Sequence, residues 1–252
     1  YLNHLEEIIQ YEGANTIAAI LIEPVTGTNG IIIPPEGYMQ GLREICDENE
    51  ILLISDEVMT GFGRTGAWFA VDNWDVKPDI ITMAKGLTSG YAPLGAVGMT
   101  SAISAHFKEH VFRSGLTYTA HPVSLAAMIA NVRVIQEDKL VENAASLGAS
   151  LNRMLSDLGE AHLSVGDVRS IGLFGVIELV KNRETKEPMT PWDSSSSEME
   201  GFKKFCRRNG LFISVHWPTV LIIPPLNITE KELAEGFAIL DEALKITDEG
   251  VE

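Results

Sequence analysis

The spacing of hydrophobic and polar residues in the first half of the chain predicts strands that alternate with helices. Two near-continuous apolar runs, 17–24 (IAAILIEP) and 51–55 (ILLIS), are typical of parallel strands that are buried on both faces. The segment 34–50 between them opens with two prolines, which suit the first turn of a helix. Its apolar face consists of Tyr38, Leu42, Ile45 and Cys46. Strand, helix and strand predict a right-handed βαβ unit, and the runs 79–83 and 95–100 predict two further strands.

Two long helices are predicted next, each with a regular apolar stripe. The first stripe consists of Leu125, Met128, Ile129, Val132 and Ile135, and the second of Leu140, Ala144, Leu147, Leu151, Met154 and Leu158. A strand at 168–179 and a polar loop at 182–197 follow. Ser197 and Glu200 have the spacing of a capping box, which predicts the start of another helix.

The last part of the chain combines short strands with one more helix. Strands are expected at 211–215 and 220–223, and the final helix begins at Thr229 with Glu232 as its capping partner. Its buried face consists of Leu233, Phe237, Leu240 and Leu244. We therefore predict an α/β fold. It has a mainly parallel sheet flanked by helices in residues 1–138 and a smaller α+β domain in residues 139–252.

Composition narrows the class of partner. With 252 residues, 45% of them hydrophobic, the chain is long enough to bury a substantial core. A net charge of −16 would repel a phosphate backbone, so nucleic acid is not an expected partner. No apolar run approaches the roughly 20 residues that a membrane helix needs. A basic segment followed by an apolar one is also absent, so a cytoplasmic protein is expected.

The cysteines and the paired histidines do not predict a metal site. Cys46 and Cys206 are far apart in helical segments, which predicts buried, reduced thiols. His106 and His110 are four residues apart but lack a nearby third ligand, so we interpret them as surface histidines.

Gly61, Gly63 and Gly66 match the G-x-G-x-x-G pattern of a dinucleotide-binding turn. Such a turn needs a helix directly after its glycines, because the helix N-terminus holds the pyrophosphate. No helical stripe follows Gly66, and Glu57 would place a negative charge beside the pyrophosphate. The glycines are therefore interpreted as letting a loop fold tightly over something else.

Ionisable residues follow the predicted parallel strands, where α/β proteins bind their ligands. Glu23 follows the first strand, Asp56 and Glu57 end the second, and Lys85 comes two residues after the third. A structural salt bridge is one reading of Asp56 and Lys85. Pyridoxal phosphate is the other, since its protonated ring nitrogen binds a carboxylate and its aldehyde forms an imine with a lysine. The glycines around Lys85 favour close approach of a ligand.

The segments LLISDEVMTGFGRTG, PDIITMAKGLTSGYAPLGAV and TYTAHP closely resemble the class III (ω-type) aminotransferases, which belong to the fold-type-I pyridoxal phosphate enzymes. The resemblance extends from ILIEP to LIIPPLNITEKEL. It implies that Lys85 is the Schiff-base lysine and that Asp56 pairs with the pyridinium nitrogen. Val58 would pack on the cofactor ring, and the Thr117 hydroxyl would reach the cofactor phosphate of the neighbouring subunit. Glu23 matches an acid of the family's cofactor site, where a structural role remains equally open.

The same resemblance implies an activity. The expected reaction moves an amino group from an ω-amine, a β-amino acid or a similar donor to a small 2-oxo acid such as pyruvate, by a ping-pong mechanism. A homodimer with shared active sites is expected. Members of the family carry a large segment before the first matched strand, so the chain is expected to be the C-terminal part of a longer enzyme. The alternatives are a catalytically silent fragment that acts as an interaction module, or another class III enzyme such as an aminomutase.

Three positions bear on the substrate. Relatives that act on ornithine or γ-aminobutyrate carry a switching glutamate and a glutamine where this chain has Thr28 and Met59. His216 stands where many ω-type relatives place an arginine that grips the substrate carboxylate. Arg113 is a candidate for an alternative anchor. His121, before Pro122 at a helix start, is expected to pack or to form hydrogen bonds.

Overall fold

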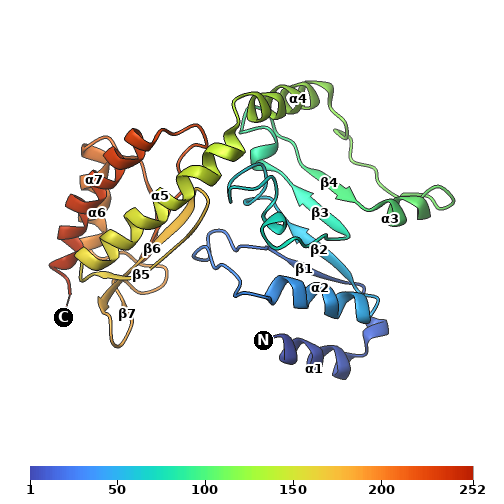
Figure 1. The fold of residues 1–252 in the computed structure, drawn as a ribbon, viewed down its shortest axis with the longest axis horizontal. Helices are drawn as coiled ribbons and strands as arrows, with labels where there is room; N and C mark the ends of the chain where they lie inside the picture. Colours follow the sequence, from blue (N-terminus) through green and yellow to red (C-terminus); the bar gives the residue numbers. More distant parts are fainter. Residues whose placement is uncertain (252) are drawn as a thin grey trace. The chain divides into compact units, whose positions relative to one another are not determined.

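The apolar runs of the first half form a four-stranded sheet in the computed structural model, which describes residues 1–251 (Figure 1). The strands are β1 (Ala19–Ile22), β2 (Leu52–Asp56), β3 (Ile80–Met83) and β4 (Ala96–Met99), in that spatial order. β1, β2 and β3 are mutually parallel, as predicted. β4 runs antiparallel to β3, because the connection 84–95 contains only a short 3-10 helix and no crossover helix. The sheet is therefore mixed.

Helices α1 (Leu2–Glu12) and α2 (Tyr38–Glu48) pack against β1 and β2 through one apolar cluster. α2 begins at Tyr38 rather than at the prolines, because Gly37 has a left-handed backbone (φ 77°) that a helix cannot include. Met39 also belongs to its buried face, whereas Tyr38 is only half-buried.

Burial on both faces was predicted for the strands of the runs 17–24 and 51–55, and this is wrong for β1. Successive side chains of a strand point to opposite faces of the sheet. Ile20 and Ile22 pack with the α2 cluster, but Leu21 between them is 64% exposed. In β4, Val97 is 59% exposed. An apolar run alone does not reveal which of its faces is covered.

The remaining elements of this half are short 3-10 helices and two α-helices. They are η1 (Ala14–Thr16), η2 (Ala70–Trp74), η3 (Lys85–Leu87), α3 (Ser101–His106) and α4 (Pro122–Glu137). α4 packs near β3 and β4 in a second apolar cluster with Phe62 and Leu87. Of the predicted α4 stripe, Ile135 is buried and Ile129 is exposed. His106 and His110 are exposed, as expected, with their rings stacked 4.0 Å apart.

The second half contains an antiparallel sheet covered by three helices. The strands β5 (Val165–Ile171), β6 (Phe174–Asn182), β9 (Thr219–Ile222) and β8 (Ser214–His216) lie in that order, and β7 (Glu187–Pro188) pairs with β6. The helices are α5 (Leu140–Ala161), α6 (Ser197–Arg208) and α7 (Glu230–Asp248), of which α6 and α7 lie side by side (Figure 1). Their core includes Leu151, Leu155, Ile177, Phe202, Phe237 and Leu244.

Two sequence-based details are wrong in this half. The single strand predicted at 168–179 is a hairpin that turns at Gly172, whose φ of 55° suits glycine. The N-cap of α6 is Ser196 instead of Ser197, since the Ser196 hydroxyl accepts the Met199 N–H. At α7 the predicted capping box of Thr229 and Glu232 is confirmed.

Contacts divide the chain into two compact units. Unit 1 comprises Tyr1–Val25 and Pro34–Val141, and unit 2 comprises Thr26–Ile33 and the chain from residue 142 onward. The predicted domains, 1–138 and 139–252, assign the segment 26–33 differently and stay a prediction.

Both cysteines are buried and free, as predicted. Burial raises the pKa of the Cys46 thiol, and it raises the pKa of Cys206 to about 11. Among residues 1–251, no cluster of His, Cys, Asp and Glu is arranged to hold a metal ion. Within the same range, no helix is both long and apolar enough to span a membrane.

Candidate active site

Lys85 lies in a tight turn that follows β3, and we call residues 84–89 the lysine turn. The Lys85 carbonyl accepts the N–H groups of Thr88 (3.2 Å) and Ser89 (2.9 Å), and the Leu87 N–H donates to the Ala84 carbonyl (2.9 Å). Lys85 has a positive φ of 39°, a conformation that costs a non-glycine residue on the order of 1–3 kcal/mol. Such strain persists only where surrounding contacts enforce it, so this lysine is held in place rather than free to relax.

Asp56 ends the neighbouring strand. In the parallel β2–β3 pair it is the register partner of Thr82. Thr82 lies three residues before Lys85 in the sequence. Its Oδ1 accepts the Val58 N–H at 3.0 Å. Within the described chain no ion pair joins Asp56 to Lys85, although their strands are adjacent. The structural salt bridge considered from the sequence is therefore not formed.

The carboxyl ends of β1, β2 and β3 meet at one edge of the unit 1 sheet. Glu23 follows β1 and is half-buried, while Asp56, Val58 and Met59 lie at the end of β2, also half-buried. Lys85 follows β3, and its side chain is exposed. The parallel register thus brings these sequence-predicted residues to the same edge.

Glu57 has a role that sequence reasoning missed. Its side chain is fully buried and its two oxygens accept the N–H groups of Ala70 (2.9 Å) and Val71 (3.0 Å), at the start of η2. The Thr60 hydroxyl also donates to it. Burial raises the pKa of this carboxyl. Since η2 is a short 3-10 helix whose first N–H groups bind Glu57, these groups are not available to a pyrophosphate.

The glycine loop, residues 61–66, packs against the lysine turn. A Cβ added to Gly86 would lie 3.0 Å from the Phe62 Cβ and 3.2 Å from the Gly61 carbonyl oxygen. Only a glycine allows the two segments to approach so closely. Burial lowers the pKa of Arg64, in the same loop, to about 10. The glycine loop thus folds tightly over the lysine turn.

Thr117 and His121 lie in an exposed part of unit 1. Thr117 belongs to a turn before α4, and its side chain is exposed. His121 is the N-cap residue of α4: its carbonyl accepts the Leu125 N–H, and its ring lies 6.4 Å from that of Tyr118. The expected structural role of His121 at the helix start agrees with these contacts.

His216 lies in unit 2 at the end of β8, in a hairpin with β9 that we call the histidine hairpin (Ser214–Ile222). Its carbonyl accepts the Thr219 hydroxyl at 2.7 Å. Trp217 at the turn has a positive φ of 51°, and its ring lies 3.7 Å from that of Trp192. Thr28, the other substrate candidate in unit 2, is exposed in the segment 26–33, where an Arg169 N–H donates to the Gly30 carbonyl at 2.6 Å.

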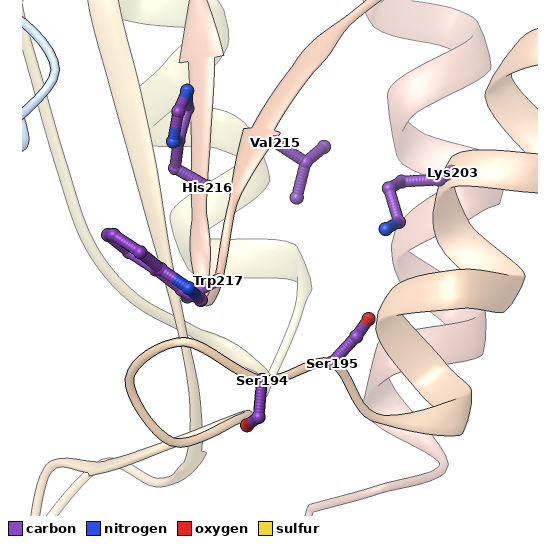
Figure 2. A pocket seen from close by; sticks show the side chains of 6 residues that line it. All are labelled: Ser194, Ser195, Lys203, Val215, His216 and Trp217. Carbon is purple, nitrogen blue, oxygen red and sulfur yellow. The ribbon is translucent and has the colours of Figure 1, made fainter.

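A pocket of about 240 Å³ lies at the histidine hairpin. Figure 2 shows its lining: Ser194 and Ser195 from the loop before α6, Lys203 from α6, and Val215, His216 and Trp217 from the hairpin. Val215 points toward α6, whereas His216 extends from the other side of β8, as expected for successive strand residues. His216, the candidate for substrate binding, therefore borders a polar pocket.

Known proteins with similar sequences and structures identify the family. The family model for aminotransferase class-III matches residues 1–244. Taurine–pyruvate aminotransferase of Bilophila wadsworthia is 37% identical over 255 residues, which cover 97% of this chain and 56% of that protein. Omega-aminotransferase of Caulobacter vibrioides is 42% identical over 234 residues, with coverage of 90% and 51%.

A solved structure supports the same family assignment. Taurine:2-oxoglutarate aminotransferase from Bifidobacterium kashiwanohense, in complex with PLP and glutamate, matches with a TM-score of 0.94 and 44% identity. The match covers 99% of this chain and 56% of that one. The chain belongs to the class III aminotransferase family, and its α/β fold is that of these transaminases. It spans about half the length of the curated relatives it matches.

Proposed function

We propose that the protein carrying this chain is a pyridoxal-phosphate-dependent aminotransferase. It moves an amino group from an ω-amine, a β-amino acid or a similar donor to a small 2-oxo acid such as pyruvate. The observation that carries the proposal is that Asp56 ends β2 and a strained Lys85 follows the adjacent parallel strand β3, without an ion pair between the two. The names of the relatives, which include taurine–pyruvate and putrescine–pyruvate aminotransferases, support the donor and acceptor classes.

The residues of the strand ends fit the cofactor. Asp56 Oδ1 accepts the Val58 N–H, and Oδ2 accepts no hydrogen bond among residues 1–251, so it can accept one from a protonated ring nitrogen. The Lys85 amine has no ion-pair partner within the described chain. When bound, pyridoxal phosphate supplies an electron sink for charge that develops on the donor carbon. The bond from the Val58 N–H to Asp56 supports a proposed role for Val58 in packing on the ring.

Each residue then has a defined task. Lys85 Nζ would hold the cofactor covalently at rest. With the cofactor bound, the freed Lys85 Nζ would act as general base on the proton of the donor carbon and then as general acid. Asp56 keeps the ring nitrogen protonated throughout. The same groups serve the acceptor in reverse, which gives ping-pong kinetics.

Substitution of the two residues in the complete polypeptide tests this function. Wild type with pyridoxal phosphate should show visible absorbance, and borohydride should leave a pyridoxyl label on Lys85. Lys85→Ala should lose turnover and label but keep its fold, because the side chain is exposed. Asp56→Asn should still bind the cofactor and lose most of its activity.

The contrary outcomes are equally clear. Near-normal rates in Asp56→Asn would remove its role at the ring nitrogen. No cofactor absorbance in the complete wild-type protein would favour a catalytically silent interaction module instead. Turnover without a 2-oxo acid acceptor would point to an aminomutase.

We also propose a homodimer with shared active sites, in which Thr117 serves the cofactor phosphate of the partner subunit. The turn of Thr117 and the segments beside it expose large apolar side chains, which favours an interface. They are Val111, Phe112, Leu116, Tyr118 and Val123. Sedimentation of the active species measures the state, and full activity from a monomer would exclude the shared site. Two buried reduced thiols support a cytoplasmic location.

A further inference from the structure

Asn131 of α4 binds the backbone of the lysine turn. Its Nδ2 lies 2.8 Å from the Gly86 carbonyl oxygen and 3.2 Å from the Leu87 carbonyl oxygen. An asparagine amide has two N–H donors, enough to serve both of these carbonyls, which belong to the two residues after Lys85. The side chain is half-buried, which limits competition from water.

The lysine turn is held on two further sides. The glycine loop presses on Gly86 through Gly61 and Phe62. Leu87 is buried in the cluster that includes Ile135 of α4. Asn131 supplies the directional contacts among these, because packing limits how far a backbone moves whereas two hydrogen bonds fix its orientation. Together the contacts enforce the positive φ of Lys85.

We propose that Asn131 is a positioning residue: it acts through the Gly86 and Leu87 carbonyls to hold Lys85 in its strained conformation and so to aim the Lys85 amine. The catalytic consequence rests on the proposed function, whereas the structural one does not. A reacting amine displaced by 1 Å can lose on the order of 100-fold in rate. Because the proposed effect of Asn131 passes only through the Gly86 and Leu87 carbonyls, its loss should lower kcat and leave the donor KM almost unchanged.

Asn143 provides a matched control. Its Nδ2 also donates to two carbonyls, those of Leu226 (2.7 Å) and Ile228 (3.0 Å), but in unit 2. Asn131→Ala and Asn143→Ala therefore remove the same group and the same number of hydrogen bonds at two different places. Only the first should affect the lysine turn.

The experiment measures amide hydrogen exchange in the complete, cofactor-free protein, followed by kinetics and borohydride labelling of the loaded enzyme. The Leu87, Thr88 and Ser89 amides, which are hydrogen-bonded within the turn, should exchange about tenfold faster in Asn131→Ala and unchanged in Asn143→Ala. The label on Lys85 and kcat should fall in the first variant only. Asn131→Ser, which keeps one donor, should lie between wild type and Asn131→Ala, and it replaces the alanine variant if that one does not fold.

Unchanged exchange of these three amides in Asn131→Ala overturns the proposal, as does equal loosening of the lysine turn in both alanine variants. If the wild-type protein takes no label on Lys85, the proposed function fails. The exchange data then still decide whether Asn131 holds the turn.

Discussion

The lysine turn and the histidine hairpin each contain a non-glycine residue at positive φ, but different contacts surround that residue. The residue is Lys85, at 39°, in the turn and Trp217, at 51°, in the hairpin. The lysine turn is supported by two hydrogen bonds and by a glycine contact that leaves no room for a Cβ. The histidine hairpin is held by its β8–β9 pairing and by the Thr219 hydroxyl bond to the His216 carbonyl, but its turn residue Trp217 meets only a tilted indole ring, that of Trp192, which is 77% exposed.

Directional hydrogen bonds and close packing restrict an atom's position more than a contact with an exposed aromatic ring does. The residue proposed to move protons therefore has a rigid support, and the residue proposed to meet the substrate has an adjustable one. Changes to each support should separate the two properties.

The largest effect is expected from Gly86→Ala. The new Cβ would lie 3.0 Å from the Phe62 Cβ and 3.2 Å from the Gly61 carbonyl oxygen, so we expect the lysine turn to shift by a few tenths of an ångström. We expect kcat to fall by about 100-fold, together with the borohydride label on Lys85. Gly95→Ala is the control in the same connection, because its Cβ would meet only the Met83 carbonyl oxygen at an ordinary 3.6 Å. Equal losses in both variants would show that the turn is not specifically constrained.

A smaller effect is expected from His216→Arg. An arginine can hold a carboxylate with two charge-assisted hydrogen bonds, whereas a neutral histidine offers one donor. The ratio of kcat/KM for a carboxylate-bearing donor to that for its uncharged amine analogue should rise about tenfold, the factor that about 1.4 kcal/mol gives. His110→Arg, on an exposed histidine of unit 1, should leave the ratio unchanged. An unchanged ratio in His216→Arg would mean that His216 does not meet the substrate and would direct attention to Arg113.

The smallest effect is expected at the Trp192–Trp217 ring pair. Trp192→Ala removes a ring pair worth about 0.5–1.5 kcal/mol. Trp217→Gly removes the same pair but relieves a left-handed residue that costs about 1–2 kcal/mol. The free energy of unfolding should therefore fall less in Trp217→Gly than in Trp192→Ala, as measured by urea denaturation. Tyr91→Ala, at an exposed residue of unit 1, controls for the loss of an aromatic ring. A larger loss in Trp217→Gly would show that Trp217 is not strained.

Elements marked by local signals could be predicted from the sequence. The capping pair Thr229 and Glu232 lies three residues apart, so α7 was predicted from its first residue. The β5–β6 hairpin was missed because its turn, at Gly172, lies in a continuous apolar run and carries no polar turn residue. Asp56 and Lys85 were found because ionisable residues at the ends of apolar strands are conspicuous, and their proposed roles stay predictions.

The supports of the candidate site could not be read from the sequence in the same way. Glu57 binds N–H groups 13 and 14 residues away, and Asn131 binds carbonyls 45 and 44 residues away. Such long-range contacts depend on the tertiary fold. No local sequence pattern around Glu57 or Asn131 indicates which residues they bind. Local pattern therefore identifies candidate reacting groups better than the groups that hold them.

The two buried cysteines give each unit its own reporter of opening. Cys46 lies in α2 of unit 1 and Cys206 in α6 of unit 2, both with fully covered side chains. With the Cys206 pKa at about 11 and that of Cys46 also raised, neither thiol forms much thiolate near neutral pH while its helix is packed. A thiol-specific reagent can therefore modify each cysteine only at the rate at which its own unit opens. The modification rate of Cys46 thus measures the opening of unit 1, which holds the lysine turn, and that of Cys206 measures the opening of unit 2, which holds the histidine hairpin.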